Sequence, residues 1–111
     1  MAVRGEVWVT ELDPTRGREQ RGTRPALVVS ADPLNTGPAH LVVLVPLTRT
    51  DRGIPLHVRI DPPNGGVRET SFAMCEAVRS VSKERLVRRW GKVDAPTMRV
   101  VDDRLKIVLD L

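Results

Sequence analysis

Arg24 is the side chain whose chemistry and position point most directly to a function. It follows a polar segment, Asp13 to Thr23, and comes directly before the apolar, β-branched run Pro25 to Ala31. We expect the polar segment to be a loop and the apolar run to be a buried strand. Such a strand would fix the backbone of Arg24 while its guanidinium holds a phosphate through two parallel hydrogen bonds. A salt-bridged arginine at the start of a strand is the simpler alternative.

Thr48 stands in a comparable position, directly after the most apolar run of the chain, Leu41 to Leu47. We expect this run to be the central strand, with Pro46 near its end because proline lacks a ladder donor. A hydroxyl just beyond a buried strand can donate to a phosphate oxygen, although a threonine in a turn often bonds its own backbone. If the strands that carry Arg24 and Thr48 pair antiparallel, as neighbours in sequence often do, both side chains reach one edge of the sheet.

Other catalytic chemistries find little support among the remaining residues. The two histidines, His40 and His57, fall at the start and in the middle of predicted strands, so a paired-histidine ribonuclease site is not favoured. Cys75 is the only cysteine, and the sequence has no His-Glu-x-x-His motif and no carboxylate cluster. We therefore expect no disulfide, no metal site and no cofactor. A Gly-rich phosphate loop and a Gly-x-Ser-x-Gly element are also absent from the sequence.

The elements that must position these residues are short. Alternating or β-branched runs predict strands at 6–12, 25–31, 41–47, 56–60 and 87–93, and either one bent strand or two over 70–75 and 77–81. Turn residues dominate 32–38 and 61–66, a polar loop is expected at 48–53, and 82–86 suits a single helical turn. Five to seven short strands with frequent turns predict a mainly β fold, a small closed or half-open barrel.

The C-terminal segment has a different periodicity. Asp94 can cap a helix and Pro96 suits its first turn. An apolar stripe then recurs at helical spacing, formed by Met98, Val101, Leu105, Val108 and Leu109. We expect one α-helix of about four turns that packs this stripe on the barrel. Its polar residues are expected to face water or a partner: Asp102, Asp103, Arg104 and Lys106.

The composition suits one domain spanning residues 1–111 and a polyanionic partner. The chain has 18 Lys and Arg against 14 Asp and Glu, which gives a formal charge of +4. Nucleic acid is the first candidate partner, and an ordinary basic protein is the alternative. No signal-peptide core and no long apolar run is present, so we expect a cytoplasmic protein without a membrane association.

Several segments together resemble one known family. They are Arg4-Gly5-Glu6-Val7-Trp8, Gly17-x-Glu19-Gln20-x-Gly22-x-Arg24 with Pro25 to Val29, Val45-Pro46-Leu47-Thr48, Ser71 to Val81, and Val100 to Leu105. In this order and spacing the chain resembles the MazF/PemK toxins of type II toxin–antitoxin systems, over nearly its whole length. The resemblance implies an SH3-like barrel with a terminal helix, a homodimer and a cognate antitoxin partner. It also implies an endoribonuclease that cleaves single-stranded mRNA at short motifs, independently of the ribosome, and so arrests translation and growth.

The resemblance also assigns roles to residues. Arg24 and Thr48 match the catalytic residues in type and context. Glu19 and Gln20 match loop residues that contact RNA, and we expect the neighbouring cations Arg18 and Arg49 to bind RNA as well. Glu76 and Arg79 fall in a stretch that lines the RNA groove in relatives, although Met74 and Glu76 stand where some relatives have an Asp and Arg pair.

The reaction itself follows from the chemistry of RNA. The 2′-OH attacks the adjacent phosphate and expels the 5′-oxygen of the next nucleotide, so the products carry a 2′,3′-cyclic phosphate and a 5′-OH. We expect Arg24 to stabilise the charge of the phosphorane, Thr48 to hold a non-bridging oxygen, and water or Glu19 to share the proton transfers. Two alternatives remain open: a gyrase poison built on the same barrel, which acts by binding alone, and an inactive SH3-like nucleic-acid-binding module.

Overall fold

The computed structural model of the protein describes residues 1–12 and 23–111. Within these ranges the strands are β1 (Glu6–Glu11), β2 (Thr23–Val28), β3 (Leu41–Thr48), β4 (His57–Ile60), β5 (Ser71–Met74), β6 (Arg79–Ser82) and β7 (Leu86–Lys92). The helices are α1 (Asp32–Thr36) and α2 (Ala95–Leu109), and single 3-10 turns lie at η1 (Asn64–Gly66), η2 (Cys75–Ala77) and η3 (Lys83–Arg85).

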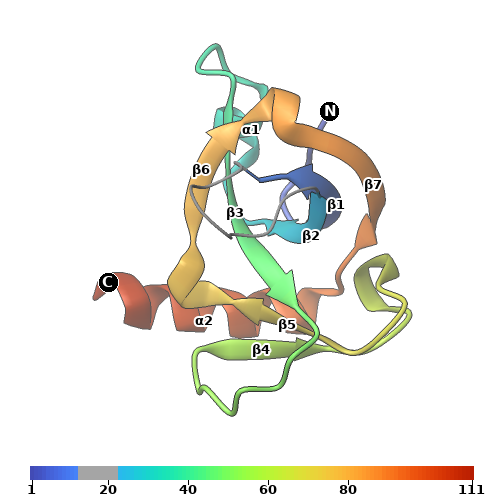
Figure 1. The fold of residues 1–111 in the computed structure, drawn as a ribbon. Coiled ribbons are helices and arrows are strands. Elements are labelled where there is room, and N and C mark those ends of the chain that lie inside the picture. The colour runs from blue at the N-terminus through green and yellow to red at the C-terminus, as the bar shows by residue number, and fades with distance from the viewer. Residues whose placement is uncertain (13–22) are drawn as a thin grey trace, which may run out of the picture.

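The strands form one curved antiparallel sheet. Their order is β4-β5-β3-β2-β1-β7, and β6 pairs with β3 beside this path. The sheet curls around β1 and β2, with β6 and β7 on opposite sides, and α2 lies along the molecule beside β4 and β5 (Figure 1). The prediction of a mainly β, half-open barrel with a C-terminal helix is therefore confirmed. None of the helices in the described ranges is long and apolar enough to cross a bilayer.

β3 is the central strand, as its composition predicted, because it is shared between three neighbours. Its first half, Leu41 to Leu44, pairs with β6. Leu44 to Pro46 pair with β2, where the ladder ends at Ala26 opposite Pro46. Its last two residues pair instead with β5, with Leu47 opposite Ala73 and Thr48 opposite Phe72. Pro46 has no N–H to donate, so the β2–β3 ladder ends at its position and the two strands separate beyond it.

The helix α2 begins and packs as its sequence predicts. The Asp94 carboxylate accepts a hydrogen bond from the Thr97 amide at 2.9 Å and so caps the helix. Val101 is fully buried in the main core cluster, and Met98, Leu105 and Val108 pack against it. The prediction was wrong for Leu109, which is 54% exposed at the last residue of the helix.

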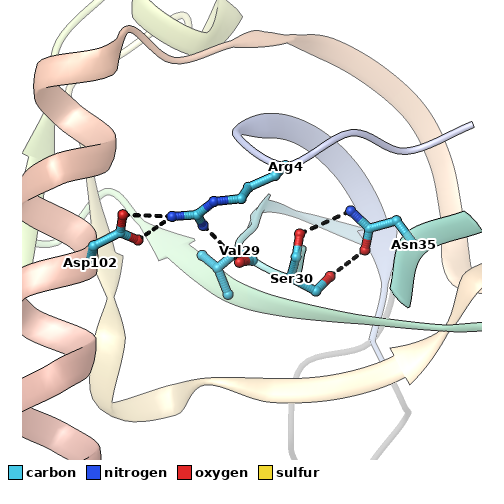
Figure 2. A network of polar contacts seen from close by, with 5 residues as sticks. All are labelled: Arg4, Val29, Ser30, Asn35 and Asp102. Atoms are coloured by element: carbon cyan, nitrogen blue, oxygen red, sulfur yellow. Dashed lines mark hydrogen bonds and ion pairs between the residues drawn. The ribbon is translucent and has the colours of Figure 1, made fainter. Parts of the chain in front are cut away.

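A second correction concerns Asp102, which was expected to face water or a partner. Its carboxylate instead pairs through both oxygens with the Arg4 guanidinium, at 2.6 Å for Oδ2, and Arg4 also donates to the Val29 carbonyl at 2.8 Å (Figure 2). The pair therefore ties α2 to the N-terminal turn and to the end of β2. Sequence periodicity could not reveal it because Arg4 and Asp102 are 98 residues apart.

The predicted turn at 32–38 contains the short helix α1. Its one turn is held by the fully buried Asn35, whose amide donates to the Ser30 carbonyl at 3.0 Å and whose oxygen accepts from the Ser30 hydroxyl (Figure 2). Pro33 near the start and Gly37 at the end suit both a turn and a helix of one turn, so the two cannot be told apart from residue types alone.

The turn η1 packs directly on the backbone of β7. Gly66 has a φ of +77°, and a Cβ built on it would lie 2.4 Å from the Trp90 carbonyl oxygen. Only glycine permits both the conformation and the approach. This contact fixes the position of Trp90 relative to the segment that follows Gly66.

Candidate active site

A pocket of about 590 Å³ opens where β2 and β3 separate. The separation follows from the two prolines: Pro25 and Pro46 both lack the amide that would continue the ladder. The pocket is lined by residues of β2, of the end of β3 and the loop after it, of the segment before β5, of the start of β5, and of β7, namely Thr23, Arg24, Pro25, Leu47, Thr48, Arg49, Thr50, Arg52, Arg68, Glu69, Ser71 and Trp90.

Arg24 and Thr48 both line this pocket, as the antiparallel pairing of their strands predicted. The register that places Ala26 opposite Pro46 and Leu27 opposite Val45 places Arg24 opposite Thr48 when it is extended by two residues. On its other side Arg24 is held by β1, where it lies opposite Thr10. The two side chains therefore start from backbone that is fixed by neighbouring strands.

Thr48 lines the pocket, and its hydroxyl makes one contact with the backbone. Its oxygen accepts a hydrogen bond from the Thr50 amide at 3.2 Å. A hydroxyl has one proton and two lone pairs, so this bond uses a lone pair and leaves the proton for another acceptor. The backbone contact expected of a turn threonine is thus present, and it orients the hydroxyl as a donor.

The pocket concentrates positive charge. Among the residues that the structure describes, four arginines line it, Arg24, Arg49, Arg52 and Arg68, and one carboxylate, that of Glu69. The described part of the lining therefore carries a net charge of +3, from four cations and one anion. Arg49 pairs with Glu69 at 2.9 Å, but both side chains are mostly exposed, so the pair is weakly held. A polyanion is the ligand that such a lining favours.

Sequence analysis did not identify two residues of this site, Arg68 and Trp90. The Arg68 guanidinium lies over the Trp90 ring, 5.8 Å from its centroid, which is within the range of a cation–π contact. Trp90 falls inside the strand predicted at 87–93. No local signal marks either residue, because they are 22 positions apart in the sequence and meet only through the packing of η1 on β7.

The predicted RNA-binding residues fall into three groups. Arg49 lines the pocket. Glu76 and Arg79 do not: the Glu76 carboxylate instead contacts Nε2 of His57 at 2.7 Å, and the His57 side chain is only 3% exposed. Arg18, Glu19 and Gln20 lie outside the described residues. RNA binding by all of these residues stays a prediction.

The buried groups near α2 do not form a reactive centre. Burial, and then the negative charge of Glu76, raise the pKa of the Cys75 thiol to about 11 although Arg104 opposes the shift. The thiol is therefore protonated at neutral pH and a poor nucleophile. In residues 1–12 and 23–111, no three side chains of His, Cys, Asp or Glu are grouped so that they could hold a metal ion.

Comparisons with known proteins agree with the fold. The family profile described as "PemK-like, MazF-like toxin of type II toxin-antitoxin system" matches residues 3–109. The chain is 37% identical over 116 residues to the endoribonuclease MazF9 of Mycobacterium tuberculosis, covering 100% of this chain and 98% of the relative. It is 34% identical over 109 residues to the endoribonuclease EndoA of Bacillus subtilis, covering 97% and 94%.

Solved structures give the same result. The MazE–MazF structure from Deinococcus radiodurans (form II) superposes with a TM-score of 0.83 at 26% identity and covers 99% of this chain and 96% of that one. A mycobacterial endoribonuclease in complex with its cognate antitoxin has a TM-score of 0.79 at 25% identity, with 99% and 94% covered.

Proposed function

Because the chain belongs to the family of PemK-like, MazF-like toxins of type II toxin–antitoxin systems, we propose that it cleaves single-stranded mRNA in the cytoplasm, at Arg24 and Thr48. Its endoribonuclease activity follows from the family and from two relatives of that name that it matches over nearly their full length. The observation that carries the assignment of the site is the presence of Arg24 and Thr48 in one positively charged pocket.

The proposed reaction is an internal transesterification. The 2′-oxygen of one nucleotide attacks the adjacent phosphorus, the bond to the 5′-oxygen breaks, one proton leaves the 2′-OH and one reaches the departing oxygen. Arg24 stabilises the extra negative charge of the phosphorane, and the Thr48 proton holds a non-bridging oxygen. Since the guanidinium of an arginine does not release its proton in proteins, water or Glu19 transfers the protons. The products carry a 2′,3′-cyclic phosphate and a 5′-OH.

Purified protein incubated with a long single-stranded transcript and EDTA tests the activity. We expect discrete cuts whose 3′ fragments accept phosphate from a polynucleotide kinase, because their 5′ ends are hydroxyls. A 2′-deoxynucleotide at the cut position should abolish cleavage there. Cleavage that stops on addition of EDTA, or 5′-phosphate ends, would contradict the mechanism.

Substitutions test the two residues. Arg24→Ala should abolish cleavage while RNA binding survives, and Thr48→Val should lower kcat by roughly 10²-fold, the usual loss for one transition-state donor. Arg99→Ala and Thr36→Val are matched controls, because both residues are exposed and lie outside the pocket. If Arg24→Ala instead abolishes binding, Arg24 is a docking residue.

The partners proposed from the family are a second copy of the chain and a cognate antitoxin. Apolar side chains exposed on and after α2 support a protein interface there: Val100, Ile107, Leu109 and Leu111. Light scattering should give about twice the chain mass of 12.3 kDa. Co-expression of the antitoxin should relieve the growth arrest that the chain causes alone.

The gyrase-poison alternative predicts no cleavage of naked RNA, so the same incubation separates the two functions. The similarity to named endoribonucleases favours the nuclease. An inactive binding module would cause neither cuts nor growth arrest.

A further inference from the structure

We propose that Arg68, held against the ring of Trp90, binds a second RNA phosphate next to the one that is cleaved. This inference rests on the proposed function, because it extends the site of Arg24 and Thr48 along the same strand of RNA. It assigns a substrate-binding role to Arg68 and a positioning role to Trp90.

The pocket contains more arginine side chains than the binding of one phosphate requires. Arg24 and Thr48 serve the scissile phosphate, whereas Arg68 enters the same pocket from a separate element, the segment between η1 and β5. The volume of about 590 Å³ falls in the range of sites that hold whole small molecules. Successive phosphates of one strand can therefore lie in the pocket together.

Arg68 is available for this second phosphate. Its side chain is exposed and makes no ion pair with any residue of 1–12 or 23–111, whereas Arg49 is paired with Glu69, which also lines the pocket. Its guanidinium carbon lies over the Trp90 ring, 5.8 Å from the centroid. In such a contact the N–H groups lie in the plane of the guanidinium and remain available to phosphate oxygens.

Trp90 gives Arg68 a fixed support. The indole is half-buried against the main core cluster, and its Nε1 has no hydrogen-bond partner among the described residues, so packing alone holds the ring. A Cβ on Gly66 would collide with the Trp90 carbonyl oxygen at 2.4 Å, so the chain just before Arg68 is held close to β7. A cation whose support is rigid loses less freedom when it binds a phosphate.

The test uses a short RNA that the wild-type protein cuts once, and a series of versions in which one flanking phosphate at a time is a neutral methylphosphonate. We expect Arg68→Ala to lower kcat/KM roughly tenfold, the loss of one charged hydrogen bond. For the wild type, we expect a methylphosphonate at one flanking position to lower kcat/KM by about the same factor. For Arg68→Ala, a methylphosphonate at that position should lower kcat/KM less than about twofold. Arg99→Ala, which removes the same charge outside the pocket, should behave like the wild type.

Trp90 is tested by the same series with two variants. Trp90→Phe keeps a ring under the guanidinium, so its kcat/KM should still fall when the flanking phosphate that matters for the wild type is a methylphosphonate. Trp90→Leu should no longer show this fall in kcat/KM. If Trp90 had a purely structural role, the fall would remain unchanged. If Trp90→Leu does not fold, as circular dichroism would show, Arg68→Ala and Trp90→Phe still decide the matter.

The possible failures are distinguishable. If the wild type cuts no RNA, the proposed function is wrong and the inference falls with it. Only this inference is wrong if the wild type cuts RNA but Arg68→Ala has the same kcat/KM as Arg99→Ala. The same holds if methylphosphonates lower kcat/KM of Arg68→Ala as much as they lower that of the wild type. Faster cleavage by Arg68→Ala would mean that Arg68 covers a ring on which a base stacks, and would also overturn it.

Discussion

The carboxylate of Glu6 should carry a measurable part of the stability of the barrel, and this part should disappear in acid. Glu6 is buried in β1, yet it accepts three hydrogen bonds: from the Val3 amide at 2.8 Å, from the Trp8 indole at 3.0 Å and from the Arg89 guanidinium at 2.6 Å. Burial alone would raise the pKa of Glu6, but the bonds from Trp8, Arg89 and Val3 outweigh it and bring the pKa below 4.5.

The perturbation is Glu6→Gln, which keeps the shape and removes the charge. The amide oxygen can still accept from Val3 and Trp8, but the amide N–H group then faces the Nε–H of Arg89, donor against donor. A hydrogen bond between charged groups contributes about 1.5–3 kcal/mol, and the Arg89 side chain is 50% exposed, which reduces this value. We expect a loss of about 1–2 kcal/mol at pH 7. For 111 residues this corresponds to a fall in Tm of roughly 4–8 °C.

The lowered pKa of Glu6 also predicts how its contribution to stability changes with pH. A carboxyl whose pKa is lower in the folded state stabilises the protein fully above its unfolded pKa, and this contribution is lost as the pH falls through the folded pKa. The difference in unfolding free energy between wild type and Glu6→Gln should therefore be constant from pH 7 to about pH 5 and shrink below it.

Urea denaturation at several pH values and one protein concentration measures this difference. The control is Glu84→Gln, since Glu84 is exposed and its carboxylate has no hydrogen bond to a described residue. It should change the stability by no more than about 0.5 kcal/mol. A Glu6→Gln variant as stable as the wild type at pH 7, or a difference that persists unchanged at pH 3, would refute the reasoning.

Three further predictions follow from local geometry. Gly66→Ala should destabilise the protein by roughly 2 kcal/mol or more, because its Cβ would lie 2.4 Å from the backbone oxygen of Trp90; an unchanged urea midpoint would contradict the close packing of η1 on β7. Cys75, buried and with a pKa raised to about 11, should not react with a thiol reagent at pH 8 until urea unfolds the chain, and rapid labelling of the folded protein would show that its cover opens. Asp102→Asn should cost about 1 kcal/mol, because it weakens a half-exposed two-oxygen pair with Arg4; a double-mutant cycle with Arg4→Ala should give a coupling of similar size, and zero coupling would contradict the pair.

Local sequence was enough to predict the elements that carry the main candidate residues. Apolar runs with turn residues at their ends predicted β2 and β3, and the neighbourhood of the two strands predicted that Arg24 and Thr48 share an edge. Asp94 and Pro96 marked the start of α2. These features were predictable because caps, turns and periodic burial depend on residues a few positions apart.

The tertiary structure decided which side chains complete the pocket and which turn away from it. Arg68 meets Trp90 because η1 packs on β7, Glu76 turns to His57, and Asp102 pairs with Arg4. Leu109 shares the apolar stripe of α2 but lies beyond the core that buries Val101. In each case the neighbour that decides the outcome is many residues away in the sequence. The direction in which a side chain points depends on how distant segments pair and pack, and such contacts leave no periodic pattern in the sequence.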